Sequence, residues 1–94
     1  MIRRHAVRAL APALRTLRVE LDEAAAVALL AFLHGSLGDD PRAVGRALER
    51  ERDGLWAAER GDCTVYYVID DERRIVTVTS IEPRPWPGRI TPGR

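Results

Sequence analysis

Apolar residues recur at helical intervals over the first part of this 94-residue chain. One stripe, with spacings of three or four residues, consists of Leu10, Leu14, Leu17 and Leu21. This spacing predicts a helix. Because proline is tolerated only in the first turn of a helix, we expect this helix to begin near Pro12. The preceding residues 5–10 could form either a short strand or an irregular segment.

A second helix is expected to begin directly after Asp22. An aspartate is a good N-cap, and Glu23 is favourable in the first turn beside the positive end of the helix dipole. The apolar stripe of this helix consists of Ala26, Leu29, Leu30, Leu33 and Leu37. Gly35 and Gly38 weaken the end of the helix, so it should stop between them. The next residues, 39–41, have the composition of a turn.

Residues 42–53 follow this turn and could form a helical turn or an ordered loop. They carry four arginines, interleaved with two glutamates: Arg42, Arg46, Arg50 and Arg52. The planar guanidinium donates to phosphate through two parallel hydrogen bonds, so the four arginines are candidate phosphate-binding residues. The alternative is an ordinary solvated face of mixed charge.

From Gly54 onward the hydrophobic period changes from helical spacing to two. Strands are expected at residues 55–60, 63–70 and 74–82, with a tight turn at Gly61 and Asp62. Two helices followed by an antiparallel meander predict an α+β domain with the helices packed on one face of the sheet. We expect this single domain to span residues 1–84. Residues 85–94 form a proline-rich tail that cannot continue a sheet.

The composition narrows the class of protein. All fifteen basic residues are arginine, but the net charge is only +1, which argues against binding of nucleic acid by charge alone. The single cysteine, Cys63, excludes an internal disulfide, and no apolar run approaches the ~20 residues of a membrane span. We therefore expect a cytoplasmic protein. No metal-ligand spacing or phosphate-cradling glycine loop is present, so no cofactor is expected.

Three segments, read in order, carry a recognisable pattern. They are FLHGSLGDDPRAVGRAL at residues 32–48, GLWAAERGDCTVYYVIDD at 54–71 and IVTVTSIEPR at 75–84. Their order and spacing resemble the actinobacterial branch of the RelE family, within the RelE/ParE superfamily of bacterial toxins. The resemblance covers most of residues 14–84.

The resemblance implies both a fold and a function. The fold is a short strand at residues 5–10, two antiparallel helices and a twisted antiparallel sheet. The function is that of the toxin of a type II toxin–antitoxin system, which enters the ribosome and cleaves mRNA as an endoribonuclease. The related ParE toxins instead poison DNA gyrase. Either kind of toxin is held inactive in a heteromeric complex with a cognate antitoxin, and neither implies a membrane partner.

The most specific motif of the family, RRGdYRVvY, falls on residues 59–67. The matching residues include Arg60, Gly61, Asp62 and Tyr67. Glu59 replaces the first arginine, and Cys63 replaces a tyrosine. Thr64 replaces the arginine that is thought to hold the scissile phosphate in the family. A hydroxyl cannot supply the charge of a guanidinium.

Other residues of the family site are retained only in part. Arg84 matches a later arginine, but the family's C-terminal tyrosine has no counterpart, and the indole of nearby Trp86 cannot exchange a proton. Positions that carry catalytic lysines in some members fall near Leu55 and Ala57. The candidate catalytic residues are Arg84, Arg60 and Tyr66, and the RNA-binding candidates are Arg42, Arg46, Arg50 and Arg52.

Several alternatives stay open at this point. Tyr66 should share a sheet face with Thr64, where it could donate a proton or stack on a base, or simply pack beneath the tail. Cys63 is favoured as a core residue, and His34 as a surface or capping residue. The chain could be an mRNA endonuclease of reduced activity, a ParE-like toxin that binds gyrase, or a degenerate toxin that retains only antitoxin binding.

Overall fold

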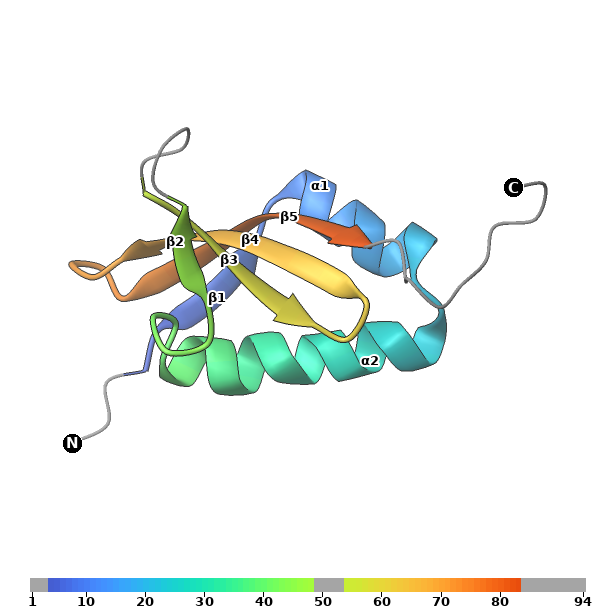
Figure 1. Cartoon of the computed structure of the whole chain (residues 1–94), viewed down its shortest axis with the longest axis horizontal. Coiled ribbons are helices and arrows are strands. Elements are labelled where there is room, and N and C mark those ends of the chain that lie inside the picture. Colours follow the sequence, from blue (N-terminus) through green and yellow to red (C-terminus); the bar gives the residue numbers. More distant parts are fainter. Residues whose placement is uncertain (1–3, 49–53, 84–94) are drawn as a thin grey trace.

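The computed structural model describes residues 4–48 and 54–83 (Figure 1). Two helices and five strands follow one another along these residues. The helical part comprises α1 (Ala11–Arg15) with a π-helical continuation (Thr16–Glu20), and α2 (Glu23–Phe32) with a second π-helical continuation (Leu33–Leu37). The strands are β1 (Ala6–Ala9), β2 (Arg46–Leu48), β3 (Leu55–Arg60), β4 (Cys63–Asp70) and β5 (Ile75–Pro83).

The five strands form one sheet in the order β1-β5-β4-β3-β2. The three-stranded meander and the short first strand are confirmed, and so is the α+β fold. Two features differ from the sequence prediction. β1 pairs in parallel with β5, so the sheet is mixed rather than wholly antiparallel. The segment after residue 42 was expected to be a helical turn or a loop, but it contains strand β2, which pairs with β3.

The starts of both helices agree with the local signals in the sequence. Pro12 lies in the first turn of α1, where its missing N–H costs nothing. The carboxylate of Asp22 accepts a hydrogen bond of 2.8 Å from the backbone N–H of Ala25, which makes it the predicted N-cap of α2. The second helix runs past its expected end between Gly35 and Gly38: Gly38 keeps helical backbone angles (φ −67°, ψ −34°), and the N–H of Asp40 donates to the carbonyl of Ser36 at 3.0 Å.

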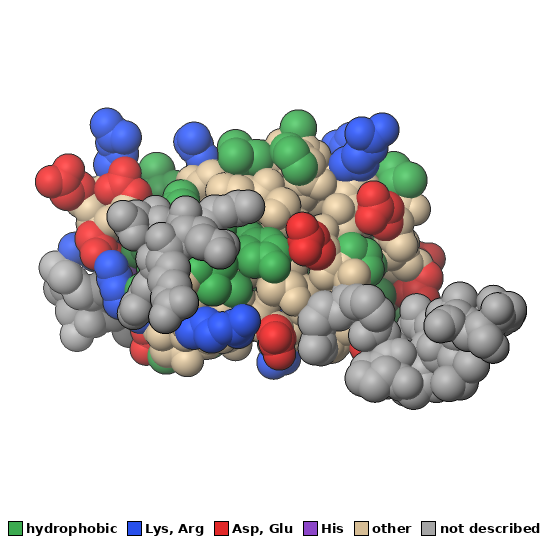
Figure 2. Space-filling model, turned by 45° about the horizontal axis from the view of Figure 1, so that its top comes forward, with side chains coloured by type: hydrophobic (Ala, Val, Ile, Leu, Met, Phe, Trp, Pro, Cys, Tyr) green, Lys and Arg blue, Asp and Glu red, His purple; other side chains and the backbone are tan. Residues whose placement is uncertain are grey.

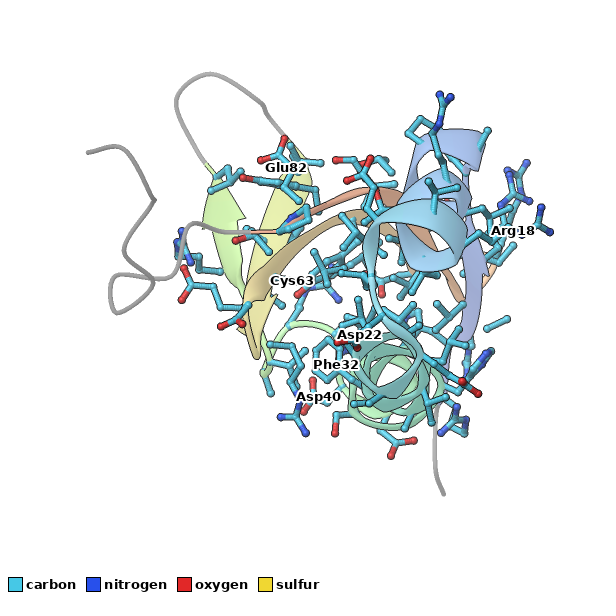
Figure 3. The ribbon with its side chains drawn as sticks, turned by 90° about the vertical axis from the view of Figure 1, so that its right-hand side faces the viewer. Arg18, Asp22, Phe32, Asp40, Cys63 and Glu82 are labelled. Atoms are coloured by element: carbon cyan, nitrogen blue, oxygen red, sulfur yellow. The ribbon has the colours of Figure 1, made fainter. Side chains whose placement is uncertain are left out.

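One face of the sheet, which we call the inner face, packs against the helices. Its central side chains on β4 are Cys63, Val65 and Tyr67, all buried, and they join a cluster with Leu29 and Phe32 of α2. Cys63 is therefore a core residue, as predicted. The opposite face, which we call the open face, carries the alternate side chains of the same strands. Figure 3 shows Phe32 and Glu82 on opposite sides of the sheet.

The first helix lies beside β5 at the point where β1 has ended. The Thr16 hydroxyl donates a 3.0 Å hydrogen bond to the backbone carbonyl of Ile81, and the N–H of Leu10 donates to the carbonyl of Val78 at 2.9 Å. The first helix thus takes over from β1 in covering the edge of β5.

Some predictions fall beyond the part of the chain that is described. Arg84 and the tail at residues 85–94 lie outside it, as do Arg50 and Arg52. In the helices of residues 4–48, no segment is long and apolar enough to cross a membrane.

Candidate functional site

Two cross-strand rows of side chains define the centre of the open face. The register places Glu59 of β3 and Glu82 of β5 on either side of Thr64 of β4. We call these three residues the Thr64 row. Tyr66 lies two positions further along β4, where Ala57 of β3 and Ser80 of β5 flank it in the same way. Arg46 of β2 lies beyond Ala57. We call this second set of four residues the Tyr66 row.

The Thr64 row contains two carboxylates and no cation. Thr64 is only 7% exposed, whereas Glu59 and Glu82 are exposed. Directly opposed side chains in adjacent strands have Cβ atoms about 4.5–5.5 Å apart, so both glutamates start from positions next to Thr64. In Figure 2, acidic side chains lie near the middle of this face as well as at its two ends. The position at which the family resemblance leads one to expect a cation is therefore locally acidic.

The Tyr66 row is an aromatic ring between small neighbours. Tyr66 is half-buried on the same face as Thr64, as the alternation predicted, and its cross-strand neighbours are Ala57 and Ser80. An aromatic ring at a strand position of this kind can stack on a base. Beyond Ala57, the side chain of Arg46 is 62% exposed, and its guanidinium lies 3.8 Å from the Glu59 carboxylate.

Arg60 does not lie with Tyr66. It pairs with Cys63 at the end of β3, and its guanidinium carbon lies 5.1 Å from the centre of the Phe32 ring, on the inner face. A cation over an aromatic ring is a packing interaction that stabilises the helix–sheet contact. Contrary to the expectation, the structure does not bring Arg60 and Tyr66 together, because Arg60 pairs with the inward-facing Cys63, whereas Tyr66 lies on the opposite face of the sheet.

Arg42 and Arg46, expected to act together, are also separated. Both donor nitrogens of the Arg42 fork contact the Asp71 carboxylate, at 3.1 and 2.8 Å, and its guanidinium lies 5.8 Å from the Trp56 ring centre. Hydrogen bonds from Arg42 and His5 hold the pKa of Asp71 below its usual value. Arg42 thus joins the loop before β2 to the β4–β5 hairpin, while Arg46 stands on the open face. The other two RNA-binding candidates, Arg50 and Arg52, lie outside the described residues.

A buried tyrosine that the sequence analysis did not single out fixes the approach to β2. The Tyr67 hydroxyl donates a 2.6 Å hydrogen bond to the backbone carbonyl of Pro41, and burial raises the pKa of Tyr67 to about 12. Its ring also stacks on Trp56, with ring centres 6.4 Å apart. Tyr67 therefore anchors the loop that leads to β2 and Arg46. Its advance signals were its match to the last position of the family motif and its place in an alternating strand.

The remaining candidates have structural surroundings. His34 is exposed near the end of the second helix, and its backbone carbonyl accepts a hydrogen bond from Arg4. In residues 4–48 and 54–83, no three His, Cys, Asp or Glu side chains are grouped so that they could hold a metal ion.

No family model matches the chain, but individual relatives do. The toxin RelE of Mycobacterium tuberculosis is 36% identical over 74 residues, which is 79% of this chain and 76% of that protein. The toxin RelG of the same organism is 37% identical over 57 residues, 61% of this chain and 66% of that protein.

Solved structures support the same relationship. One chain of the toxin–antitoxin complex RelBE2 from Mycobacterium tuberculosis superposes with a TM-score of 0.82 at 33% identity, covering 86% of this chain and 92% of that one. The archaeal RelE–RelB complex from Pyrococcus horikoshii shares the fold, with a TM-score of 0.60 at 18% identity over 92% of this chain and 98% of that one. Both curated relatives favour RelE over ParE. The chain belongs to the RelE family of toxins.

Proposed function

We propose that this chain is the toxin of a type II toxin–antitoxin system and that it slowly cleaves mRNA at the ribosome. The observation that carries the proposal is the 36% identity to a RelE toxin, together with a fold shared with a chain solved in a toxin–antitoxin complex. Since ribosomes and mRNA are its targets, its site of action is the cytoplasm. Its partners are then a cognate antitoxin, the ribosome and mRNA.

The surface proposed for the antitoxin is the outer side of α2. This helix has the sequence EAAAVALLAF, and its apolar side chains face solvent as well as the core. Val27 is 60% exposed and Leu30 is 40% exposed, one helical turn apart. Because an isolated small domain rarely leaves a contiguous apolar strip in water, such a strip favours a protein partner. An amphipathic antitoxin helix would cover it.

The proposed chemistry uses the open face. Cleavage of RNA through the adjacent 2′-hydroxyl needs a group that accepts a proton and cations that stabilise the phosphorane. We assign base stacking to Tyr66 and phosphate contact to Arg46 and Arg84, although Arg84 lies outside the described residues. Arg60 is left out, because it lies against Phe32 on the inner face. Because Arg46 is the one candidate cation described on the open face, we expect cleavage to be slow.

Expression of the chain alone in a bacterial host tests the proposal. We expect growth arrest that co-expression of the neighbouring gene relieves, and mRNA cuts that appear only when ribosomes are present. Arg84→Ala should lower the cleavage rate by a factor of about 100 or more if Arg84 stabilises the transition state. Growth arrest with intact mRNA and inhibited gyrase would contradict the RelE-like mechanism.

A second function has a specific observation in its favour. The Thr64 row places two carboxylates where an RNA nuclease would need a cation. This favours a chain that has lost cleavage and retains antitoxin binding. In that case, co-expression still gives a stable heteromeric complex, but expression of the chain alone arrests neither growth nor translation.

A further inference from the structure

We propose that Glu59 and Glu82 act as negative determinants of RNA binding: they disfavour phosphate over the Thr64 row and so favour RNA contact at the Tyr66 row. This inference rests on the proposed function, because it assumes that RNA meets the open face. It assigns a role in specificity to two residues that do not belong to the expected catalytic set.

The geometry comes from the strand register. Glu59 and Glu82 occupy the positions directly opposite Thr64 on its two neighbouring strands, so all three side chains stand on the open face. Adjacent strands lie about 4.8 Å apart, which brings the two carboxylates onto either side of a single small residue. A phosphate placed over Thr64 would meet both of them.

The charge balance of the face points the same way. Arg46, the cation of the Tyr66 row, lies 3.8 Å from Glu59 and shares its charge with that carboxylate. Glu82 is exposed and forms none of the ion pairs found among residues 4–48 and 54–83. The two rows together therefore hold two carboxylates and one guanidinium. The Thr64 hydroxyl is neutral and its residue is buried, so the described side chains of its row supply no positive charge to attract a phosphate.

The two rows differ in what they offer to RNA. The Tyr66 row combines an aromatic ring with an exposed guanidinium, which suits a stacked base and its phosphate. The Thr64 row offers only carboxylates and a hydroxyl. Neutralising either carboxylate should therefore strengthen RNA binding, whereas neutralising Arg46 should weaken it.

The experiment measures binding of a fluorescein-labelled single-stranded RNA of about ten nucleotides, 2′-O-methylated so that it cannot be cleaved. Fluorescence anisotropy is recorded for the wild type and for Glu82→Gln, Glu59→Gln and Arg46→Gln. We expect Glu82→Gln to tighten binding about fivefold at about 0.1 M ionic strength, as removal of one charge at about 5–6 Å in partly screened surroundings predicts. The gain should shrink as salt is added and become small near 1 M, where the Debye length of about 3 Å is shorter than that separation.

Glu72→Gln is the matched control. It makes the same change of charge at the exposed β4–β5 hairpin, about 20 Å along the sheet from Thr64, which exceeds the Debye length of about 10 Å at 0.1 M ionic strength. We expect it to change the affinity less than twofold. Equal gains from Glu72→Gln and Glu82→Gln would overturn the proposal, because net charge alone would then explain them. An unchanged affinity in Glu82→Gln, or no RNA binding by any variant, would also overturn it. Growth arrest and its relief by the antitoxin are measured separately. A failure of the toxin assignment can therefore be told apart from a failure of the role proposed for Glu59 and Glu82.

Discussion

Gly45 lies directly against the hydroxyl group of Tyr67. A Cβ atom at position 45 would stand 2.6 Å from the carbonyl oxygen of Ala57 and still closer to the Tyr67 hydroxyl. The same hydroxyl donates to the carbonyl of Pro41, so glycine is the residue that lets the loop close over the tyrosine. This contact holds the entry to β2, and β2 carries Arg46 onto the open face.

Gly45→Ala should therefore lower the free energy of unfolding by roughly 1–3 kcal/mol, the usual cost of inserting a methyl group into a packed site. Urea unfolding followed by tryptophan fluorescence measures it, since Trp56 stacks on the same tyrosine. Gly35→Ala is the control, because a Cβ there would meet nothing within 4 Å. Equal unfolding free energies for the wild type and Gly45→Ala would show that the loop can move away.

The ionisation of Tyr67 should make folding sensitive to alkaline pH. Burial raises the pKa of Tyr67 to about 12, above its ordinary value of 10.0, so the folded state favours the neutral phenol. A pKa that is higher in the folded state adds to the free energy of unfolding. This added stability is fully present below pH 10 and is lost as the pH rises through about 12. The free energy of unfolding should fall across this window in the wild type. In Tyr67→Phe the fall should be smaller, and an identical pH profile would contradict the assignment.

The N-cap of α2 offers a local test of stability. Asp22→Ala removes the acceptor of the Ala25 N–H and should cost about 1 kcal/mol. Asp22→Asn keeps an oxygen acceptor at the same position and should retain most of that stability. Thermal unfolding followed by circular dichroism measures both variants. Equal losses in the two would mean that charge, rather than the cap hydrogen bond, stabilises the helix.

Thr64→Arg tests whether a cation can be restored to the open face. Thr64 is 7% exposed and stands between Glu59 and Glu82, so a new guanidinium there would pair with those carboxylates rather than with phosphate. We expect little gain in ribosome-dependent mRNA cleavage from the single substitution. Combined with Glu59→Gln and Glu82→Gln, it should give a clear gain. A strong gain from Thr64→Arg alone would show that the carboxylates do not compete.

The outer side of α2 can be tested with the antitoxin. Val27→Glu and Leu30→Glu place a charge in the strip proposed for the antitoxin and should weaken the complex roughly tenfold or more. Val27 is 60% and Leu30 40% exposed, so a charged side chain at either position can reach water, and folding of the toxin should be little changed. Val19→Glu is the matched control, because Val19 lies in the helical segment that follows α1 and is 72% exposed. Isothermal titration with the purified antitoxin measures the affinities, and unchanged values for both α2 variants would exclude this surface.

Much of the fold followed from hydrophobic spacing. β3 and β4 have the predicted bounds because alternation and turn residues delimit them, and Asp22 marks the start of α2. β2 was missed because three residues, one of them the exposed Arg46, show no readable alternation. A strand this short is defined by its pairing with β3, which is a tertiary contact.

The site was less predictable than the fold. Alternation placed Tyr66 with Thr64, but the position of Arg60 over Phe32 depends on how α2 crosses the sheet. The link between Arg42 and Asp71 joins residues 29 positions apart, which no local pattern encodes. The flanking of Thr64 by Glu59 and Glu82 requires the registers of both hairpins. The second of these contains an irregularity between Tyr66 and Tyr67, so counting from the turn would misplace part of it.

The hydrogen bond from Thr16 to the backbone of Ile81 has a consequence for self-association. A strand with unpaired amide and carbonyl groups is a template on which another chain can add a strand, and β5 is the longest strand of this sheet. The first helix closes that template beyond the end of β1. As far as the described residues extend, the outermost strands are only four and three residues long, and each carries an arginine. Such short, charged edges resist edge-to-edge growth into larger assemblies, so a copy released from its inhibitor should persist as a separate molecule long enough to reach its target.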